Sequence, residues 1–356
     1  MDFGVTFPPS PDAWRDAQIA EANGFTHAWF YDSQLMYSDV YACMALVAAH
    51  TKSMRIGTLV AVPSNRIAPV TATALATINA IAPGRVILGI GTGGTGRSTM
   101  GLPAVPVREF ASYIQQVRGL LKGEDVLFCE GEAERWIRLI HPQRQHGFVN
   151  LEDPIEIHVA ANGPRALRVA GELGDGWITP LRNAAAIDAG FRGIQAVRRD
   201  TSRPYTTALT AACVLRGREE RMSPRVLHAV GPNLVVRAHM AWETARGGGG
   251  LGLQDDTLAQ RYSAYIDRYA DAKGTPADRR YLDVHEGHLL YLKPGEEEFV
   301  SERSIGSALV GSPEQVVERV RALQAAGVSN LAVQLPGSER RELIEEFGRE
   351  VIARLS

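Results

Sequence analysis

Short runs of β-branched and aromatic residues alternate with amphipathic helical segments along most of the 356 residues, and this alternation constrains the fold more than any single motif. The pattern predicts eight strands, at Phe3–Phe7, His27–Tyr31, Arg55–Ala61, Val86–Ile90, Ile155–Ala160, Trp177–Thr179, Thr206–Val214 and Leu331–Gln334. It predicts helices at Asp12–Asn23, Asp39–His50, Val70–Ile81, Arg108–Leu121, Pro164–Leu173, Ala184–Arg199, Pro313–Ala326 and Ser338–Leu355, and a small hairpin at Val126–Arg138. Strands that alternate with helices at this spacing run parallel and are joined by crossover helices.

Such a chain can form a closed barrel or an open, doubly wound sheet. The cluster Gly89-Ile90-Gly91-Thr92-Gly93-Gly94 resembles a dinucleotide-binding turn. It follows the fourth predicted strand, however, and no acidic residue stands at the distance that the dinucleotide fingerprint requires. We therefore predict a (β/α)8 TIM barrel and treat residues 1–356 as a single domain.

The stretch from about Arg216 to Val310 interrupts the alternation, with a helix predicted around Thr257–Ala272. Long insertions in barrels usually extend the loops at the face that carries function. We therefore expect residues 216–310 to be an insertion that caps the carboxyl-terminal face of the barrel. Trp242, Tyr265, His285 and His288 are its candidates for lining a substrate pocket.

Composition excludes several classes of function. The net charge of −2 gives no indication of nucleic acid or of an acidic membrane surface as a partner. No apolar run approaches the ~20 residues of a membrane span, and the N-terminus lacks the pattern of a signal peptide. Cys43, Cys129 and Cys213 are far apart and form no CxxC pair, so we expect neither a disulfide framework nor a zinc site of that type. These features favour a cytoplasmic protein that acts on a small molecule.

Four segments fall where barrel strands end, which is the face at which barrel enzymes place their active sites. Asp32, after the second strand, could bind a cofactor hydroxyl or hold a proton, although the local pattern alone favours an N-cap or loop-turn aspartate. The segment from Gly57 to Arg66 runs from a strand into a Pro/Ser/Asn turn, and it either supports a planar ring or is simply a strand and its turn.

The glycine cluster that contains Thr92 and Gly93 lets the backbone approach a ligand closely, and we prefer this to a merely flexible loop. The turn Asn162-Gly163-Pro164 opens a predicted helix, whose unpaired N–H groups and dipole favour a phosphate. Thr179, at the end of the next strand, could add a hydroxyl to the same phosphate.

His285 and His288 flank Glu286 at a spacing of three residues. The HExxH type of zinc site needs histidines four residues apart on a helix, so this pair does not fit it. The neighbouring Val284, Leu289 and Leu290 favour a packed strand or helix. We expect no metal here, and we keep a role in structure or in the substrate pocket for both histidines.

Taken in order, these segments resemble the luciferase-like monooxygenase superfamily, and within it the branch that uses the deazaflavin coenzyme F420, with its methylenetetrahydromethanopterin reductases. The resemblance is carried by Ala22-Asn23-Gly24-Phe25, Trp29-Phe30-Tyr31-Asp32, Gly57-Thr58-Leu59-Val60, the run Gly84 to Gly93, Ala160-Ala161-Asn162-Gly163-Pro164 and Gly174-Asp175-Gly176. It covers most of residues 1–215 and returns at Gly311–Gln334.

The resemblance implies a role for several residues. Asp32 matches the acidic residue that contacts the deazaflavin, and Leu59-Val60 matches the position of a non-prolyl cis peptide behind the ring. Thr92 and Gly93 would line the edge of the ring. Asn162, Gly163 and Pro164 would hold the phosphate-bearing tail. No catalytic residue is implied directly, and Asp32 and His288 are the candidates.

Two departures from the family narrow this expectation. Its sugar-phosphate dehydrogenases carry a histidine after the strand-two aspartate and a glutamate after Gly-Thr-Gly, where this chain has Ser33 and Gly94. Both are proton-handling groups, so we expect no sugar-phosphate oxidation by that route and a bulkier or less polar substrate.

Hydride transfer with coenzyme F420 is the preferred function. A monooxygenase that uses reduced FMN and O2 is the alternative, and a non-enzymatic cofactor-binding protein is a third. Relatives of this kind are commonly homodimers that bury the outer faces of early helices.

Overall fold

The computed structural model describes residues 1–180, 183–198, 202–247, 253–337 and 339–355. Eight parallel strands close into a barrel in the order β1-β2-β3-β4-β7-β8-β9-β11, with β11 beside β1. Their bounds are β1 Asp2–Phe7, β2 His27–Phe30, β3 Arg55–Thr58, β4 Val86–Ile90, β7 Glu156–Ala160, β8 Gly176–Pro180, β9 Tyr205–Val214 and β11 Asn330–Gln334. The predicted TIM barrel is therefore confirmed, and each of its eight predicted strands is present.

The predicted helices are also present, within a few residues of the expected bounds. They are α1 Ala13–Ala22, α2 Val40–His50, α3 Ala68–Ile81, α5 Val107–Leu121, α6 Pro164–Leu173, α7 Ala184–Gln195, α12 Pro313–Ala325 and α13 Arg340–Glu350. The predicted ends at Arg199 and Ser338 lie outside the described residues. Local signals set several boundaries: Asp39 accepts a hydrogen bond from the N–H of Ala42 at the start of α2, and Gly24 has a positive φ just after α1.

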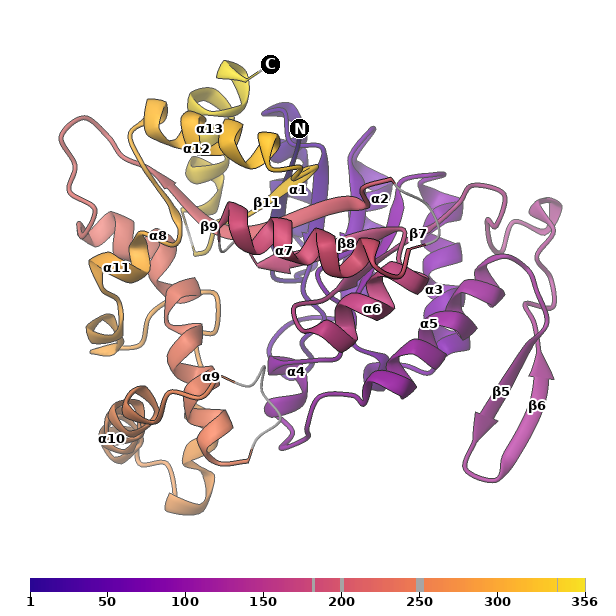
Figure 1. Ribbon diagram of the computed structural model, residues 1–356, viewed down its shortest axis with the longest axis horizontal. Helices are drawn as coiled ribbons and strands as arrows, with labels where there is room; N and C mark the ends of the chain where they lie inside the picture. Colours follow the sequence, from indigo (N-terminus) through magenta and orange to yellow (C-terminus); the bar gives the residue numbers. More distant parts are fainter. Residues whose placement is uncertain (181–182, 199–201, 248–252, 338, 356) are drawn as a thin grey trace. The chain divides into compact units, whose positions relative to one another are not determined.

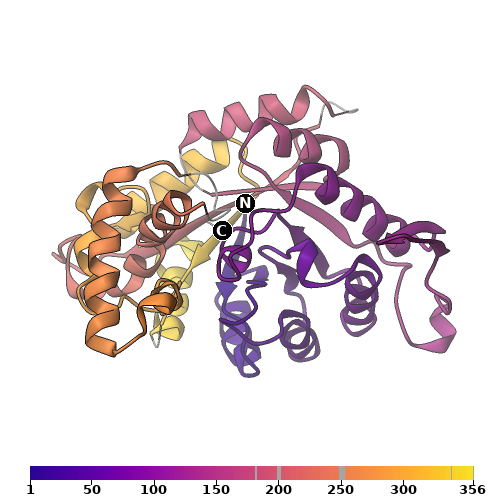
Figure 2. The ribbon, with the colours of Figure 1, turned by 90° about the horizontal axis from the view of Figure 1, so that it is seen from below.

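The chain forms two compact units. The first consists of residues 1–93, 105–209 and 322–332, and the second of residues 94–104, 210–321 and 333–356. The predicted hairpin, β5 Val126–Glu130 with β6 Ala133–Ile137, is antiparallel and extends from the first unit (Figure 1). In Figure 2 the indigo and purple helices of this unit lie outside its strands. Among the described residues, none of the helices is both long and apolar enough to cross a membrane.

Glycines make room for large rings inside the barrel of the first unit. A Cβ at Gly4 or at Gly57 would lie 2.5 Å from the Trp29 indole, and the fully buried Trp29 packs with Leu59, Ile87 and Ile178. Since Gly57 pairs directly with Trp29 across β2 and β3, only a residue without a side chain leaves space for the indole there. The barrel interior is thus a packed core.

The second unit contains most of the residues predicted to form an insertion. Its elements there are α8 Pro224–Leu234, α9 Val236–Ala245, α10 Asp256–Lys273, the turns η3 Ala277–Asp283 and η4 Glu296–Phe299, α11 Glu302–Ile305 and a short strand, β10 Leu309–Gly311. The strand β10 pairs in parallel with β9 and had not been predicted, because three residues carry no alternation pattern. That residues 216–310 cap the barrel, within one domain, stays a prediction.

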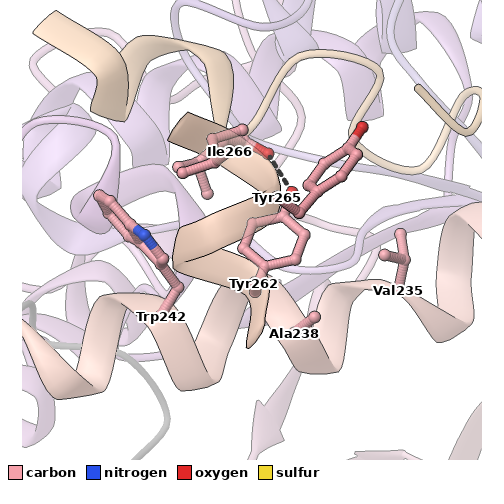
Figure 3. Packing of buried hydrophobic residues seen from close by; sticks show 7 residues of the cluster. Val235, Ala238, Trp242, Tyr262, Tyr265 and Ile266 are labelled. Atoms are coloured by element: carbon pink, nitrogen blue, oxygen red, sulfur yellow. Dashed lines mark hydrogen bonds between the residues drawn. The ribbon is translucent and has the colours of Figure 1, made fainter. Parts of the chain in front are cut away.

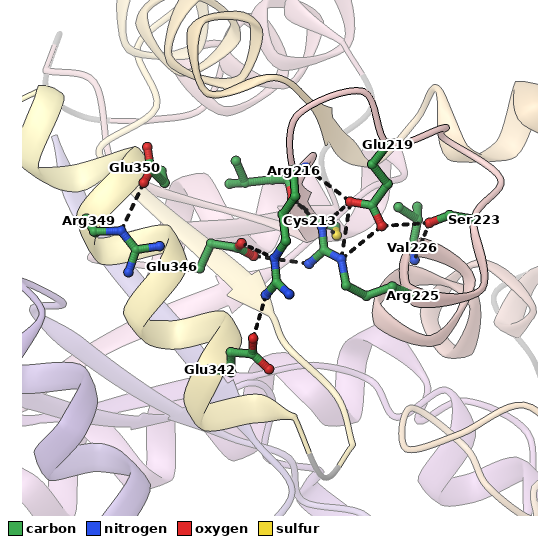
Figure 4. A network of polar contacts seen from close by, with 11 residues as sticks. Cys213, Arg216, Glu219, Ser223, Arg225, Val226, Glu342, Glu346, Arg349 and Glu350 are labelled. Carbon is green, nitrogen blue, oxygen red and sulfur yellow. Dashed lines mark hydrogen bonds and ion pairs between the residues drawn. The ribbon is translucent and has the colours of Figure 1, made fainter.

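Two clusters hold the second unit together. Val235, Ala238, Trp242, Tyr262, Tyr265 and Ile266 form an apolar cluster between α9 and α10 (Figure 3). Trp242 and Tyr265, expected as pocket residues, are packing residues of this core, 5% and 4% exposed. A polar network then ties the end of β9 to α13, where Arg216 and Arg225 share the carboxylate of Glu346 and Arg225 also pairs with Glu219 (Figure 4). Cys43, Cys129 and Cys213 are free.

Candidate functional site

The predicted cofactor residues of the first unit lie at the carboxyl ends of five neighbouring strands. Asp32 follows β2, Leu59-Val60 follows β3, Thr92-Gly93 follows β4, Asn162-Gly163-Pro164 follows β7, and Thr179 lies near the end of β8. Because these strands are parallel and adjacent in the sheet, their ends meet at one rim. The structure therefore brings the predicted residues together, while their contacts with a cofactor stay a prediction.

Hydrogen bonds and a close approach of the backbone connect the ends of these strands. The N–H of Val62, after β3, donates to Asp32 Oδ2 at 3.2 Å. A Cβ at Gly91, after β4, would lie 2.8 Å from Val60 and 3.4 Å from Ala160. Thr179 Oγ1 lies 3.3 Å from Asn162 Oδ1 and donates to it. The rim is thus a continuous arc from Asp32 to Thr179.

The third strand ends earlier than predicted. β3 stops at Thr58, and the peptide bond between Leu59 and Val60 is cis, as the resemblance implied. Ala61 pairs again with Ile90 of β4, beyond the break. The prediction of a continuous strand to Ala61 is therefore wrong, because Leu59 and Val60 leave the ladder and Ala61 pairs only through an isolated bridge.

Asp32 is a buried carboxylate that its neighbours pair only partly. Its side chain is 7% exposed, and Arg66 Nη1 lies 3.4 Å from Oδ1. Arg66 makes a closer contact with Asp39, which lies at the N-cap of α2. Burial raises the pKa of Asp32 above its usual value. Burial alone would lower the pKa of Arg66, yet the carboxylates of Asp32 and Asp39 raise it.

These two shifts show how unevenly Arg66 is shared. A well-formed ion pair would lower the pKa of Asp32. Arg66 lies closer to Asp39 than to Asp32, so the effect of burial on the pKa of Asp32 exceeds the effect of the arginine. The N-cap interpretation of Asp32 is wrong, because Asp39 caps the helix instead. Nothing in the local pattern of the Pro/Ser/Asn turn indicated that the side chain of Arg66 would contact Asp32 and Asp39.

The predicted phosphate turn is an uncapped helix start. Helix α6 begins at Pro164 after the N-cap Gly163, and no side chain of the described residues caps it. Asn162, Gly163 and Pro164 are exposed, and a Cβ at Gly163 would meet nothing within 4 Å. An exposed helix N-terminus with free N–H groups and open space is suited to binding an anion.

The glycines after β4 have different roles. A Cβ at Gly89 would lie 2.0 Å from the carbonyl oxygen of Thr58, so Gly89 is required for strand packing. Gly93 has a φ of +82°, and Thr92 accepts a hydrogen bond from the N–H of Val105 at 2.8 Å. Gly89 is therefore explained by packing, and a ligand role for the glycines that follow it stays a prediction.

His288 belongs to the second unit and lies in a histidine cluster. His239 of α9 approaches His285 and His288, and the three offer ring nitrogens within 4.8 Å of one another. Burial lowers the pKa of His239 to about 4 and that of His288 well below its usual value.

The segment around His285 consists of turns, with Gly287 and Leu289 at positive φ, so the prediction of a strand or helix there is wrong. The buried ammonium of Lys293 donates to the carbonyls of Val284 and Glu286, which removes those carbonyls from helical pairing.

His239 could not be predicted as a member of this cluster, because it stands far from His285 along the chain. Nothing in the local pattern of α9 distinguishes it from a core residue. The expectation that the chain binds no metal is not tested by these distances.

A cavity of about 570 Å³ opens elsewhere in the first unit, lined by residues that include Arg118, Glu156, Asp175 and Tyr205. It lies at the amino-terminal ends of β7, β8 and β9, opposite the rim described above. In barrels this end carries stability and the other carries chemistry, so we assign the site to the rim.

The Luciferase-like monooxygenase family matches residues 8–330 of this chain. The protein belongs to this family. It is 30% identical to the 5,10-methylenetetrahydromethanopterin reductase of Methanolobus tindarius, over 99% of this chain and 100% of the relative. It is 25% identical to the F420-dependent glucose-6-phosphate dehydrogenase of Nakamurella multipartita, over 88% of this chain and 80% of the relative.

A solved structure supports the same fold. The coenzyme F420-dependent tetrahydromethanopterin reductase of Methanopyrus kandleri superposes with a TM-score of 0.69 at 21% identity, over 100% of this chain and 99% of that one. The chain is therefore an oxidoreductase of the luciferase-like family.

Proposed function

We propose that this oxidoreductase transfers hydride between coenzyme F420 and a small organic substrate. The observation that carries the proposal is the arc along one rim of the barrel. It joins the partly paired Asp32 at one end to the uncapped start of α6 at the other. The first end can accept a hydrogen bond and the second can bind a phosphate, so the arc fits a ligand with a polar ring system and an anionic tail.

The chemical groups along the arc are of the types that a deazaflavin cofactor would need. The deazaflavin ring, when bound, supplies or accepts hydride at its carbon 5, and the protein supplies orientation and electrostatics. Asp32 would hold the polar edge of the ring, with Leu59-Val60 and Thr92-Gly93 beside it. The N–H groups at the start of α6 would hold the phosphate, with Asn162 positioned by its hydrogen bond from Thr179.

The names of the relatives support the choice of cofactor. Coenzyme F420 is named for both the Nakamurella multipartita dehydrogenase and the Methanopyrus kandleri reductase. Ser33 and Gly94 stand where the sugar-phosphate dehydrogenases have proton-handling groups, so we propose a substrate other than a sugar phosphate.

A monooxygenase that uses reduced FMN is the second candidate, since the family is named for that activity. The same uncapped helix start would accept the phosphate of FMN. Titration of the protein with each cofactor separates the two functions. Tight F420 binding without FMN binding supports the first, and O2 uptake that depends on reduced FMN supports the second. Failure of both cofactors to bind at micromolar concentrations would overturn both.

The phosphate site has a sharper test in Gly163→Asp. A Cβ at this N-cap would meet nothing within 4 Å, and the carboxylate of an aspartate there can cap α6, so the fold should be at least as stable. Its negative charge should repel the phosphate tail and weaken F420 binding by about 10-fold or more.

Asn183→Asp is the matched control, because Asn183 already caps α7 through the N–H of Ala186 and the substitution adds the same charge there. It should bind the cofactor normally. Equal affinity in wild type and Gly163→Asp would refute the phosphate role of α6.

A further inference from the structure

The strongest unexplained feature lies in the second unit, where three imidazoles converge. His239 comes from α9, while His285 and His288 come from the turns that follow η3. The Nδ1 atoms of His239 and His288 are 3.4 Å apart, and the ring centroids of the three pairs are separated by 5.5 to 5.7 Å. The His239 and His288 side chains are almost fully buried, and that of His285 is 8% exposed.

Carboxylates hold the outer nitrogens of two of these rings. His239 Nε2 lies 2.9 Å from Glu296 Oε1, and His285 Nε2 lies 2.9 Å from Glu243 Oε1. Each contact favours the tautomer with its proton on Nε2, which leaves the Nδ1 lone pair toward the other rings. A carboxylate behind the imidazole is the usual arrangement around metal-binding histidines.

Glu296 is itself held firmly, so it cannot turn away from His239. The Tyr262 hydroxyl donates to it at 2.7 Å, and Lys293 contributes its N–H at 2.9 Å and its ammonium at 2.6 Å. Tyr262 in turn packs in the apolar cluster of α9 and α10 (Figure 3). Glu243 stands one turn after His239 on α9, so a single helix supplies one of the three imidazoles and the carboxylate of another.

A second observation points to a ligand at the centre. The Nδ1 atom of His285 is buried and has no hydrogen-bond partner among the described residues. A buried acceptor without a donor is unfavourable, and buried polar atoms in proteins are usually paired. This unpaired nitrogen belongs to a ring whose centroid lies 5.7 Å from that of His239 and 5.5 Å from that of His288.

We propose that His239, His285 and His288 bind a divalent transition-metal ion, with Zn²⁺ the best match. Imidazole nitrogens suit zinc, and three protein ligands with one open position are typical of zinc sites that also hold water or a substrate. Tetrahedral ligands at 2.0–2.1 Å from zinc lie about 3.3 Å apart. The 3.4 Å pair matches this spacing, and small side-chain rotations would close the remaining separations of up to 4.8 Å.

The structure also leaves room for a fourth ligand. A cavity of about 20 Å³ is lined by Gly94, Thr95, Ser98, His239, Glu243 and His285, among others. This volume accommodates one water molecule. The open position of the metal would face this cavity, where Glu243 could accept a hydrogen bond from the bound water.

Metal titration of the purified, chelator-treated protein tests the proposal. We expect one equivalent of Zn²⁺ to bind with submicromolar affinity and to raise the melting temperature, since the metal binds only the folded site. Co²⁺ should give the visible absorption bands of a four-coordinate, nitrogen-rich site. His285→Gln should weaken binding by about 100-fold or more and abolish these bands. Glu243→Gln keeps all three ligands and should weaken binding by about 10- to 100-fold.

A surface histidine pair provides the matched control. His141 and His146 are exposed, lie in the other unit, and have ring centroids 5.7 Å apart, the same spacing as in the cluster. The double variant His141→Ala/His146→Ala should bind like wild type. The proposal is overturned if wild type shows no saturable binding below about 10 μM. It is equally overturned if binding survives in His285→Gln and disappears in the double variant.

Discussion

At the scale of single residues, the site depends on one arginine shared between two aspartates. Arg66 makes its closer contact with Asp39 at the exposed start of α2, and only a 3.4 Å contact with the buried Asp32. Asp32 therefore retains much of the energetic penalty of burying its charge, which its raised pKa reflects. A residue that lowers the stability of the free protein and lies at the functional rim is typical of a binding site, where function is retained at the expense of stability.

This leads to a prediction for Asp32→Asn. Because the pKa of Asp32 is raised in the fold, its contribution to stability is fully present below the unfolded pKa and is lost as the pH rises through the folded pKa. The amide of the substituted side chain carries no charge, so the variant should equal wild type in acid. At pH 7 its free energy of unfolding should be unchanged or higher by up to about 1 kcal/mol. Urea unfolding at a series of pH values measures this difference.

Asp39→Ala is the control, and it should lower the free energy of unfolding. Asp39 accepts a hydrogen bond from the N–H of Ala42 as the N-cap of α2, so its loss should cost about 1 kcal/mol. A strong destabilisation by Asp32→Asn at pH 7 would show that Arg66 neutralises Asp32 after all.

At the scale of elements, the barrel depends on large and small residues alternating between neighbouring strands. Trp29 on β2 faces Gly4 on β1 and Gly57 on β3, so three strands share the volume of one indole. At the amino-terminal end of the barrel, His158 on β7 fills the space that Gly176 leaves on β8 in the same way. The strands can pack this closely only because the glycines have no side chain.

We therefore expect Gly57→Ala to destabilise the protein. Its Cβ would lie 2.5 Å from the Trp29 ring and 3.0 Å from the Ile87 carbonyl, and neither atom can move freely in the barrel. Overpacking of this kind costs about 1–3 kcal/mol, measurable by urea or thermal unfolding. In Gly193→Ala the new Cβ meets only the side chain of Leu167 at 3.2 Å, so this helical control should be neutral or slightly stabilising. Equal effects of the two substitutions would contradict this account of the core.

A pH dependence belongs to the start of β7. Glu156 lies 2.8 Å from His158 Nε2 and 3.1 Å from Arg55, and the hydrogen bond from His158 lowers its pKa to about 2. A lowered pKa stabilises the fold above the unfolded value of ~4.5, and this stabilisation is lost as the pH falls toward 2.

Glu156→Gln should therefore be less stable than wild type at pH 5–7, by about 1 kcal/mol once the partial exposure of the side chain is allowed for. The difference should disappear near pH 2 in unfolding experiments across this range. Glu134→Gln, exposed on β6, makes the same change of charge and serves as the control. If the difference in stability between Glu156→Gln and wild type did not change with pH, the glutamate would contribute by packing and not by ionic pairing with His158 and Arg55.

At the scale of the whole molecule, the outer faces of the early helices suggest how copies would associate. Leu46 on α2 and Val70 and Ile81 on α3 are 37%, 49% and 45% exposed, and α2 packs directly against α3. We propose that these faces form a homodimer interface, as the resemblance to the family implies.

Light scattering should then give a mass of about 77 kDa, twice the 38.7 kDa of the chain. Val70→Asp should shift the protein toward the monomer, because it would bury an unpaired charge in the interface. Leu127→Asp, on the projecting hairpin, is the control and should stay dimeric. A monomeric wild type at micromolar concentration would contradict the proposal.

The barrel and its rim could be predicted because they follow local patterns. Alternation within a strand, apolar spacing within a helix, Asp39 at a cap and Pro164 at a first turn act over a few residues, and the structure has an element at each expected place. The positions of Asp32, Thr92 and Asn162 at one rim then follow from parallel strands.

Other features depended on contacts between residues distant in sequence, which local patterns do not contain. The unequal sharing of Arg66, the early end of β3 and the short strand β10 depend on which partner lies nearby. The approach of His239 to His285 and His288 also depends on such contacts, since α9 and the later turns come together only when the second unit packs its own core.

The sequence by itself determined the barrel and the order of its strand-end segments. Only the tertiary structure decided the two compact units, the pairing of Asp32 and the histidine cluster, because burial and distance between remote residues exist only in the folded chain.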